Sequence, residues 1–223
     1  PAGLVTVHTG ATGTGMVGSI GASPILTGDS FSFDITPTTN FPNLTFAGMV
    51  VETNDAFVAP GSAGIALLNG DGTPRTAAAI EADILNMLTV WDAGTEANQV
   101  PGVGQDQAPR QSAANTGAVD PVATVRPYND ATNDLAGSQA GGFASLTITH
   151  GADPLSFVVT VTNTSDATVY PGALTPLTWA THDSTVSLFE IGDPATPGLE
   201  SLAEDGDAAA LAAELAGATG VGA

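Results

Sequence analysis

The sequence contains no cysteine and no lysine, and its three arginines, Arg75, Arg110 and Arg126, stand against 23 acidic residues. The absence of cysteine excludes disulfides, thiolate metal sites and cysteine nucleophiles, although it does not fix the compartment. The formal net charge of −20 at pH 7 argues against nucleic acid as a partner, because phosphate binding needs clustered Lys and Arg. It also disfavours direct docking on anionic lipid, and no apolar run approaches the roughly 18 residues of a membrane span.

The acidic excess has two interpretations. The simpler one is a solvation layer that keeps the protein soluble in salty surroundings. The other is that some carboxylates bind divalent cations or a cationic surface. The first residue is Pro1 rather than Met, and either a cleaved signal peptide or proteolysis of a longer chain would explain that start.

Short apolar segments separated by Gly, Pro and Asn turns dominate the chain, and long helical periodicity is missing until near its C-terminus. These segments predict strands over 4–8, 30–35, 43–52, 63–68, 145–150, 156–163 and 185–189. Such a pattern is typical of an all-β fold, and we expect one antiparallel β-sandwich domain of about seven to nine strands.

Helices are expected in two places. Apolar residues at helical spacing predict a short helix over 76–88. Near the C-terminus, Pro197 is placed to start a helix, and Asp207 is placed to cap a second one that ends at Gly217. Between these regions, 98–142 is rich in Gln, Asn, Asp, Pro and Gly. We expect it to be a long loop, and loops of that length usually carry function or are ordered by a partner.

Signals for an enzyme are weak. The three histidines, His8, His150 and His182, lie far apart and form no metal-ligand pair, and no nucleophile elbow or phosphate-binding loop is present. We expect each histidine to be structural or on the surface, with His182 buried and hydrogen-bonded. A hydrolase remains the third and weakest function hypothesis, because no nucleophile and base can be named.

Two polar segments at the ends of apolar runs favour a metal site. Asn54 and Asp55 follow the apolar run 46–51, while Asp92 and Glu96 flank a small Ala-Gly-Thr bend that can turn both carboxylates to one point. Hard cations such as Ca²⁺ take six to eight oxygens from groups of this kind. The alternative is that Asp55 and Asp92 only cap turns by accepting backbone N–H bonds.

At these residues the sequence resembles the spondin family of secreted domains. The matching blocks are Trp91-Asp92-Ala93-Gly94-Thr95-Glu96, Thr53-Asn54-Asp55-Ala56-Phe57, and the segments 175–182, 188–192 and 198–207. The resemblance implies an antiparallel β-sandwich with Ca²⁺ at one end, held by Asp55, Asp92 and Glu96, with Asn54 as a weaker candidate. Glu96 stands where the animal proteins have Asp. The resemblance also implies an extracellular or cell-surface location and no catalytic activity.

The order of the blocks is reversed relative to the family. Residues 156–223 resemble a family N-terminus and residues 1–150 resemble the remainder. The chain is therefore either a circular permutant of a spondin domain or a segment that spans parts of two successive repeats of a longer polymer. If 156–223 folds back onto 1–150, one closed domain results. If it pairs with a neighbouring copy instead, head-to-tail repetition gives a filament.

Two function hypotheses follow. The first is a calcium-stabilised adhesion or extracellular-matrix module, with a surface or matrix component as its partner. The second is a self-assembling filament subunit whose partner is another copy of itself. The assembly state separates the two.

Overall fold

A computed structural model of the 223-residue chain describes residues 5–8, 16–84, 88–128, 135, 142–165 and 170–218. Its strands are β1 (Val5–His8), β2 (Val17–Ile20), β3 (Ser30–Ile35), β4 (Asn43–Met49), β5 (Ala56–Ala59), β6 (Ile65–Ala66), β7 (Thr89–Asp92), β8 (Arg126–Pro127), β9 (Ala144–His150), β10 (Phe157–Asn163) and β11 (Leu177–His182). Its helices are α1 (Ala77–Ile84), α2 (Pro197–Asp205) and α3 (Ala208–Gly217).

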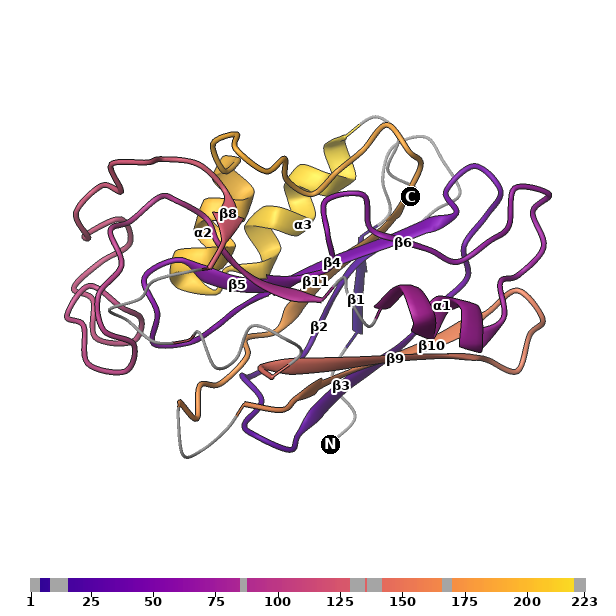
Figure 1. The fold of residues 1–223 in the computed structure, drawn as a ribbon, viewed down its shortest axis with the longest axis horizontal. Coiled ribbons are helices and arrows are strands. Elements are labelled where there is room, and N and C mark those ends of the chain that lie inside the picture. The colour runs from indigo at the N-terminus through magenta and orange to yellow at the C-terminus, as the bar shows by residue number, and fades with distance from the viewer. Residues whose placement is uncertain are drawn as a thin grey trace.

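The strands form two antiparallel sheets that face each other (Figure 1). The larger sheet has the order β1-β2-β11-β4-β5-β7-β8, with β6 also paired to β4, and the smaller sheet has the order β3-β10-β9. The expected all-β sandwich is therefore confirmed. The described residues contain eleven strands, more than expected, because several have only two to four residues.

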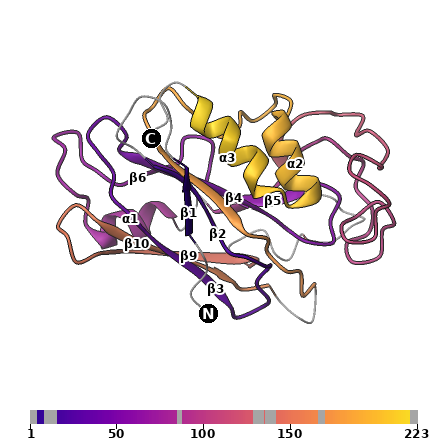
Figure 2. The same cartoon turned by 180° about the vertical axis from the view of Figure 1, so that it is seen from behind.

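The apolar core has two layers, one on each side of the larger sheet. Between the sheets, Trp179 of β11 stacks on Phe33 of β3, with ring centroids 5.1 Å apart. On the outer face of the larger sheet, Ala180 belongs to a second cluster that includes Leu199 of α2 and Leu211 of α3. Figure 2 shows these two helices lying across that outer face. Strand β11 is thus buried on both sides, as its unbroken burial indicates.

The two C-terminal helices begin and end where local chemistry predicts. Thr196 caps α2 by accepting the N–H of Leu199, and Gly206 ends it with a left-handed φ of 71°. Asp207 then caps α3 by accepting the N–H groups of Ala209 and Ala210 at 2.9 and 3.2 Å. None of the helices in the described part of the chain is long and apolar enough to cross a membrane.

The C-terminal third is built into both sheets of its own chain. Strand β10 lies between β3 and β9, and β11 lies between β2 and β4. Strands β9 and β10 form a direct hairpin, closed by the Gly151 N–H donating to the Ser156 carbonyl at 2.8 Å. Both strands thus pair within their own chain here, and the choice between closure and exchange with a neighbouring copy stays a prediction.

The prediction of a strand over 185–189 is wrong. The Asp183 carboxylate accepts both the N–H and the hydroxyl of Thr185, at 2.7 and 2.6 Å, which bends the chain into a turn. Leu188 and Phe189 are nevertheless buried, because Phe189 packs on the rings of Trp91 and Phe57.

Two other strands are shorter than predicted, and one helix covers only part of its predicted range. Strand β4 ends at Met49 because the chain turns over 51–55 into β5, and the strand predicted over 63–68 is reduced to β6. Helix α1 covers 77–84 of the predicted 76–88, while 85–87 lie outside the described residues. The predicted loop of 98–142 contains only β8 in its described part, which is 98–128, 135 and 142.

Candidate functional site

The pairing of β5 with β7 brings Asp55 and Asp92 to the same end of the larger sheet. Ala56, the first residue of β5, is directly opposite Asp92, the last residue of β7. Asp55 immediately precedes β5, and its carbonyl accepts the N–H of Ala93 at 3.1 Å. Both carboxylates are buried, with Asp55 0% and Asp92 2% exposed. Two acidic side chains that are 37 residues apart in the sequence therefore share one interior site.

The two oxygens of Asp55 have different surroundings. Oδ2 accepts the backbone N–H groups of Thr95 and Glu96, at 2.7 and 3.2 Å, and the Thr95 hydroxyl at 3.2 Å. Oδ1 is fully buried and has no hydrogen-bond partner among the residues that the structure describes. A buried acceptor that stays unpaired costs about 1–3 kcal/mol, and more when it is charged.

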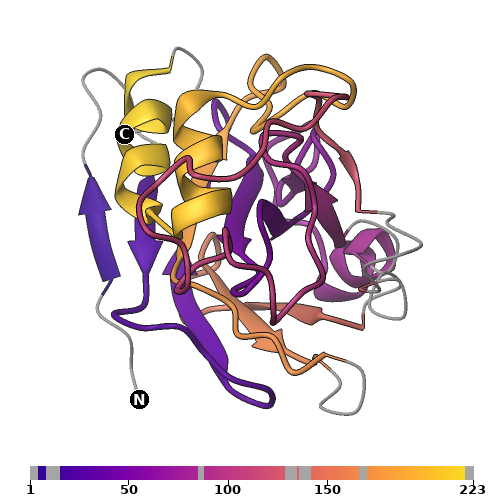
Figure 3. The same cartoon turned by 90° about the vertical axis from the view of Figure 1, so that its left-hand side faces the viewer.

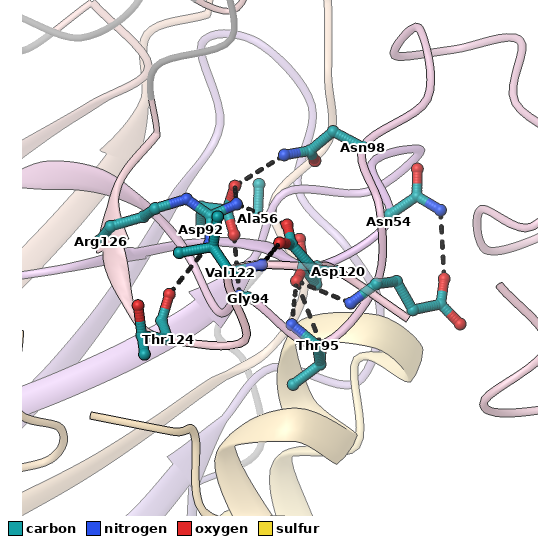
Figure 4. Close-up of polar contacts among 12 residues, drawn as sticks. Asn54, Ala56, Asp92, Gly94, Thr95, Asn98, Asp120, Val122, Thr124 and Arg126 are labelled. Atoms are coloured by element: carbon teal, nitrogen blue, oxygen red, sulfur yellow. Dashed lines mark hydrogen bonds and ion pairs between the residues drawn. The ribbon is translucent and has the colours of Figure 1, made fainter. Parts of the chain in front are cut away.

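Both carboxylate oxygens of Asp92 accept hydrogen bonds. Its Oδ1 accepts the N–H of Gly94 at 2.8 Å, and its Oδ2 accepts from Asn98 Nδ2 at 2.6 Å and from Arg126 Nη2 at 2.8 Å. Figure 4 shows Asp92 between the Arg126 and Asn98 side chains. Arg126 lies opposite Asp92 in the β7–β8 pair, so the sheet register itself sets this contact.

The other two predicted ligands serve the long loop instead. Glu96 Oε1 accepts the N–H of Gly117 at 2.7 Å, and its Oε2 accepts from Asn54 Nδ2 at 3.1 Å. Asn54 Oδ1 accepts from the Gln99 N–H and from Gln107 Nε2, at 2.9 and 3.2 Å. Glu96 and Asn54 therefore hold residues 99–117 against the end of the sheet. Both carboxylate oxygens of Glu96 and the amide oxygen of Asn54 accept hydrogen bonds.

The site thus brings together Asp55 and Asp92 but not all the residues expected to bind metal. Among the residues that the structure describes, no three Asp, Glu, His or Cys side chains are grouped so that they could hold a metal ion. The turn-capping alternative is what the structure contains, because Asp55 and Asp92 both accept backbone N–H groups of the 93–96 bend. Turn capping does not account for the burial of Asp55 Oδ1 without a partner among the described residues.

The acidity of the pair reflects its burial. Burial, reinforced by the charge of Asp92, raises the pKa of Asp55 to about 7, although the bonds from Thr95 and Glu96 oppose the rise. Burial also raises the pKa of Asp92, while Arg126 and the bond from Asn98 lower it. Two like charges in one dry site repel each other unless a proton or a cation lies with them.

Arg126 and Asp120 are site residues that the sequence patterns do not reveal. Arg126 Nη2 lies 2.5 Å from Asp120 Oδ2 as well as 2.8 Å from Asp92 Oδ2, so one guanidinium nitrogen bridges two carboxylates. Asp120 comes from the long loop, where its Oδ1 accepts the N–H of Val122 at 2.6 Å. One signal was available, because a chain with only three basic residues against 23 acidic ones is expected to pair each of them with a carboxylate.

Glu204 of α2 is another buried carboxylate beside the same bend, with 1% exposure. Burial raises its pKa to about 7, and the nearby charges of Glu96, Glu200 and Asp205 act in the same direction. The Thr95 side chain bonds both Glu204 and Asp55. Since a hydroxyl has one proton to donate, a proton on Glu204 allows both bonds to form. Figure 3 shows the long loop lying over α2 at this end of the molecule.

The Asp-Ala-Gly-Thr bend requires a glycine at position 94. The φ of Gly94, +70°, lies in the left-handed region, and an added Cβ would come within 2.7 Å of three backbone atoms of Thr124. The bend therefore requires glycine both for its conformation and for the close approach of the chain that leads to Arg126.

The histidines lie away from this site. His182 is fully buried, and its Nδ1 lies 2.7 Å from the Asp183 carbonyl, as expected. His150 is exposed on β9 and packs against Phe157. The side chain of His8 lies outside the described residues.

Comparisons with family models, with curated proteins and with solved structures find no match to this chain.

Proposed function

We propose that the chain is a non-enzymatic, calcium-binding module of the extracellular space with an adhesive or structural role, in which Asp55 and Asp92 bind the ion. The observation that carries the proposal is Asp55 Oδ1, which is fully buried, has no partner in the described part of the chain and belongs to a carboxylate that feels the charge of Asp92. A bound cation would pair this oxygen and offset the repulsion between the two carboxylates.

The donors at the site suit calcium better than a softer metal. Calcium takes carboxylate, amide and backbone oxygens together with water, and it needs no thiolate or imidazole ligand. Asp55 and Asp92 fit this role, because they are two carboxylates in one interior site. In the part of the chain that the structure describes, Glu96 is not grouped with the two aspartates into a metal-binding cluster, and Glu96 Oε1 and Asn54 Oδ1 bind the long loop through Gly117, Gln99 and Gln107. The remaining oxygens would come from the backbone and from water.

The surroundings support an ion that stabilises loops. The residues that contact Asp55 and Asp92 belong to the 93–98 bend and to β8. An ion at this point would hold the end of the sheet and the start of the long loop together. Extracellular modules work with calcium dissociation constants of about 10⁻⁴–10⁻³ M, so two carboxylates are sufficient there. The resemblance to spondin domains supports the extracellular and adhesive part of the proposal.

The test is thermal unfolding with calcium and with EDTA. A ligand that binds only the folded state stabilises by RT ln(1 + [L]/Kd), roughly 2.7 kcal/mol at a hundredfold excess over Kd. For a domain of this size, that corresponds to an increase in Tm of about 5–10 °C. The matched control is Asp34→Asn, which removes the same charge from an exposed position on β3. Calcium should stabilise the wild type and Asp34→Asn equally, and it should not stabilise Asp55→Asn. Equal Tm values in calcium and in EDTA for the wild type would refute the proposal.

A further inference from the structure

We infer that Arg126 is the resident counter-cation of this site, which pairs with Asp92 when calcium is absent and is exchanged for the ion when calcium binds. The inference rests on the proposed function, and it assigns to one residue the control of calcium affinity. It starts from the way in which a single guanidinium nitrogen is shared between Asp92 and Asp120.

The placement of Arg126 is set by the fold. Arg126 and Asp92 are directly opposite each other in β8 and β7, and Arg126 Nη1 also donates to the Thr124 carbonyl at 3.0 Å. Opposite charges in directly facing positions of an antiparallel pair attract each other. The sheet therefore delivers one positive charge to a buried carboxylate that would otherwise have only an amide partner, Asn98, at its Oδ2.

The pairing of Arg126 differs from that of the other two arginines. Each arginine of the chain pairs with a carboxylate, but Arg75 and Arg110 pair with the partly exposed Asp83 and Glu52. Among the ion pairs of the described residues, only those of Arg126 involve buried carboxylates, with side-chain exposures of 2% for Asp92 and 6% for Asp120. Burying an unpaired carboxylate costs several kcal/mol of folding free energy. The charge of Arg126 offsets this cost when no metal is bound.

The same geometry provides a route for exchange. The Arg126 side chain is 28% exposed, so it can move toward solvent without breaking the core. Asp120 lies on the loop and can keep its pair with Arg126 after Asp92 is released. A doubly charged ion beside Asp92 would repel the guanidinium and attract the carboxylates of Asp92 and Asp55 more strongly than Arg126 does. Binding of calcium and pairing of Arg126 with Asp92 should therefore be mutually exclusive.

The first experiment is calcium titration by calorimetry of the wild type, Arg126→Gln, Arg126→Lys and Arg75→Gln. Removal of the competing charge should tighten calcium binding by about tenfold or more in Arg126→Gln. Arg126→Lys keeps the charge and should stay within about threefold of the wild type. Arg75→Gln makes the same change in net charge at a distant pair and should leave affinity unchanged.

The outcomes separate this inference from the proposed function. If the wild type binds calcium and Arg126→Gln binds it no more tightly, the exchange is wrong and the calcium site stands. If the wild type does not respond and Arg126→Gln does, the native chain is not a calcium module, but Arg126 still supplies the charge that calcium can replace. If neither responds, both are wrong.

A second measurement covers the case in which Arg126→Gln does not fold without calcium. The chain has three arginines and no lysine, so the NMR spectrum of arginine side-chain N–H groups contains only three sets of signals. Calcium should shift the Arg126 signals and speed their exchange with water, while those of Arg75 and Arg110 stay in place. Binding of calcium with unchanged Arg126 signals would overturn the inference.

Discussion

Asp55 accepts the backbone N–H of Thr95 at 2.7 Å across 40 residues of sequence, while its other carboxylate oxygen, Oδ1, is buried without a partner among the described residues. One oxygen thus shapes the Asp-Ala-Gly-Thr bend, and the other is left for a proton or a cation.

Replacement of Asp55 by Asn should stabilise the metal-free protein at pH 8. The pKa of Asp55 is raised to about 7, so the wild type holds an ionised, partly unpaired carboxylate at that pH. An amide keeps an acceptor for the Thr95 and Glu96 N–H groups and carries no charge. We expect an increase of about 1 kcal/mol or more, or roughly 2–4 °C in Tm, measured in EDTA. The difference should shrink as the pH falls through 7 and vanish only below 3.8, the ordinary pKa of this carboxyl in the unfolded chain. A large loss of stability in Asp55→Asn across this whole pH range would show that the ionised form is needed for folding.

Replacement of Glu204 by Gln should flatten the pH dependence of stability. A carboxyl whose pKa rises from 4.5 to about 7 on folding contributes stability below pH 4.5, and that stability is lost as the pH rises through 7. Glu204→Gln should therefore match the wild type near pH 4.5 and exceed it by roughly 1–3 kcal/mol at pH 8. Urea unfolding at the two pH values measures this. Glu81→Gln, at an exposed position of α1, is the control and should leave the slope unchanged.

Replacement of Gly94 by Ala should be strongly destabilising. The new Cβ would clash with the backbone of Thr124 at a residue whose φ is +70°. We expect a loss of about 2–4 kcal/mol by chemical denaturation, together with loss of any calcium response. Gly61→Ala, where nothing lies within 4 Å, should change stability little. A Gly94→Ala protein as stable as the wild type would mean that the bend has another conformation.

Monovalent salt should raise the Tm. The net charge is −20, and each arginine is already paired with a carboxylate, so repulsion among the remaining acids is uncompensated. Screening shortens to about 3 Å at 1 M salt, which relieves that repulsion. The measurement is Tm against NaCl in EDTA. A flat curve would indicate that the acidic surface does not destabilise the fold.

The intact chain should remain a monomer. Strands β10 and β11 fill interior positions of both sheets within one chain, so no strand of a neighbour is required. Light scattering from micromolar to millimolar protein should give a mass near 22.0 kDa throughout. Filaments, or a mass that grows with concentration, would favour segment exchange between copies instead.

The sequence predicts those parts of the fold that depend on local chemistry. Helices α2 and α3 begin at residues that favour a helix start, Pro197 in the first turn of α2 and Asp207 as the cap of α3, and both signals can be recognised from the local sequence. Strand β11 was not predicted, because it is buried on both faces and so shows no alternation. The strand predicted over 185–189 failed because the Asp183 side chain diverts the backbone into a turn.

The candidate site was predictable only in part, because some of its residues are brought together by contacts between segments that are distant in the sequence. Asp55 and Asp92 each follow an apolar run, and adjacent strand ends meet at one edge of a sheet. The contribution of Asp120 and Glu204 depends on how a long loop and a C-terminal helix pack against that edge. Contacts of that kind have no periodic signature in sequence. The partners that occupy the Glu96 oxygens, Gly117 and Asn54, were hidden for the same reason.

The most direct test of the central claim is calorimetric titration of calcium into metal-free wild type and Asp55→Asn. We predict one saturable site per wild-type chain, with a Kd of about 10⁻⁴–10⁻³ M, and no saturable binding in Asp55→Asn. Asp34→Asn should behave as the wild type. The absence of saturable binding in the wild type at millimolar calcium, or equal binding in Asp55→Asn, would contradict the assignment of this site.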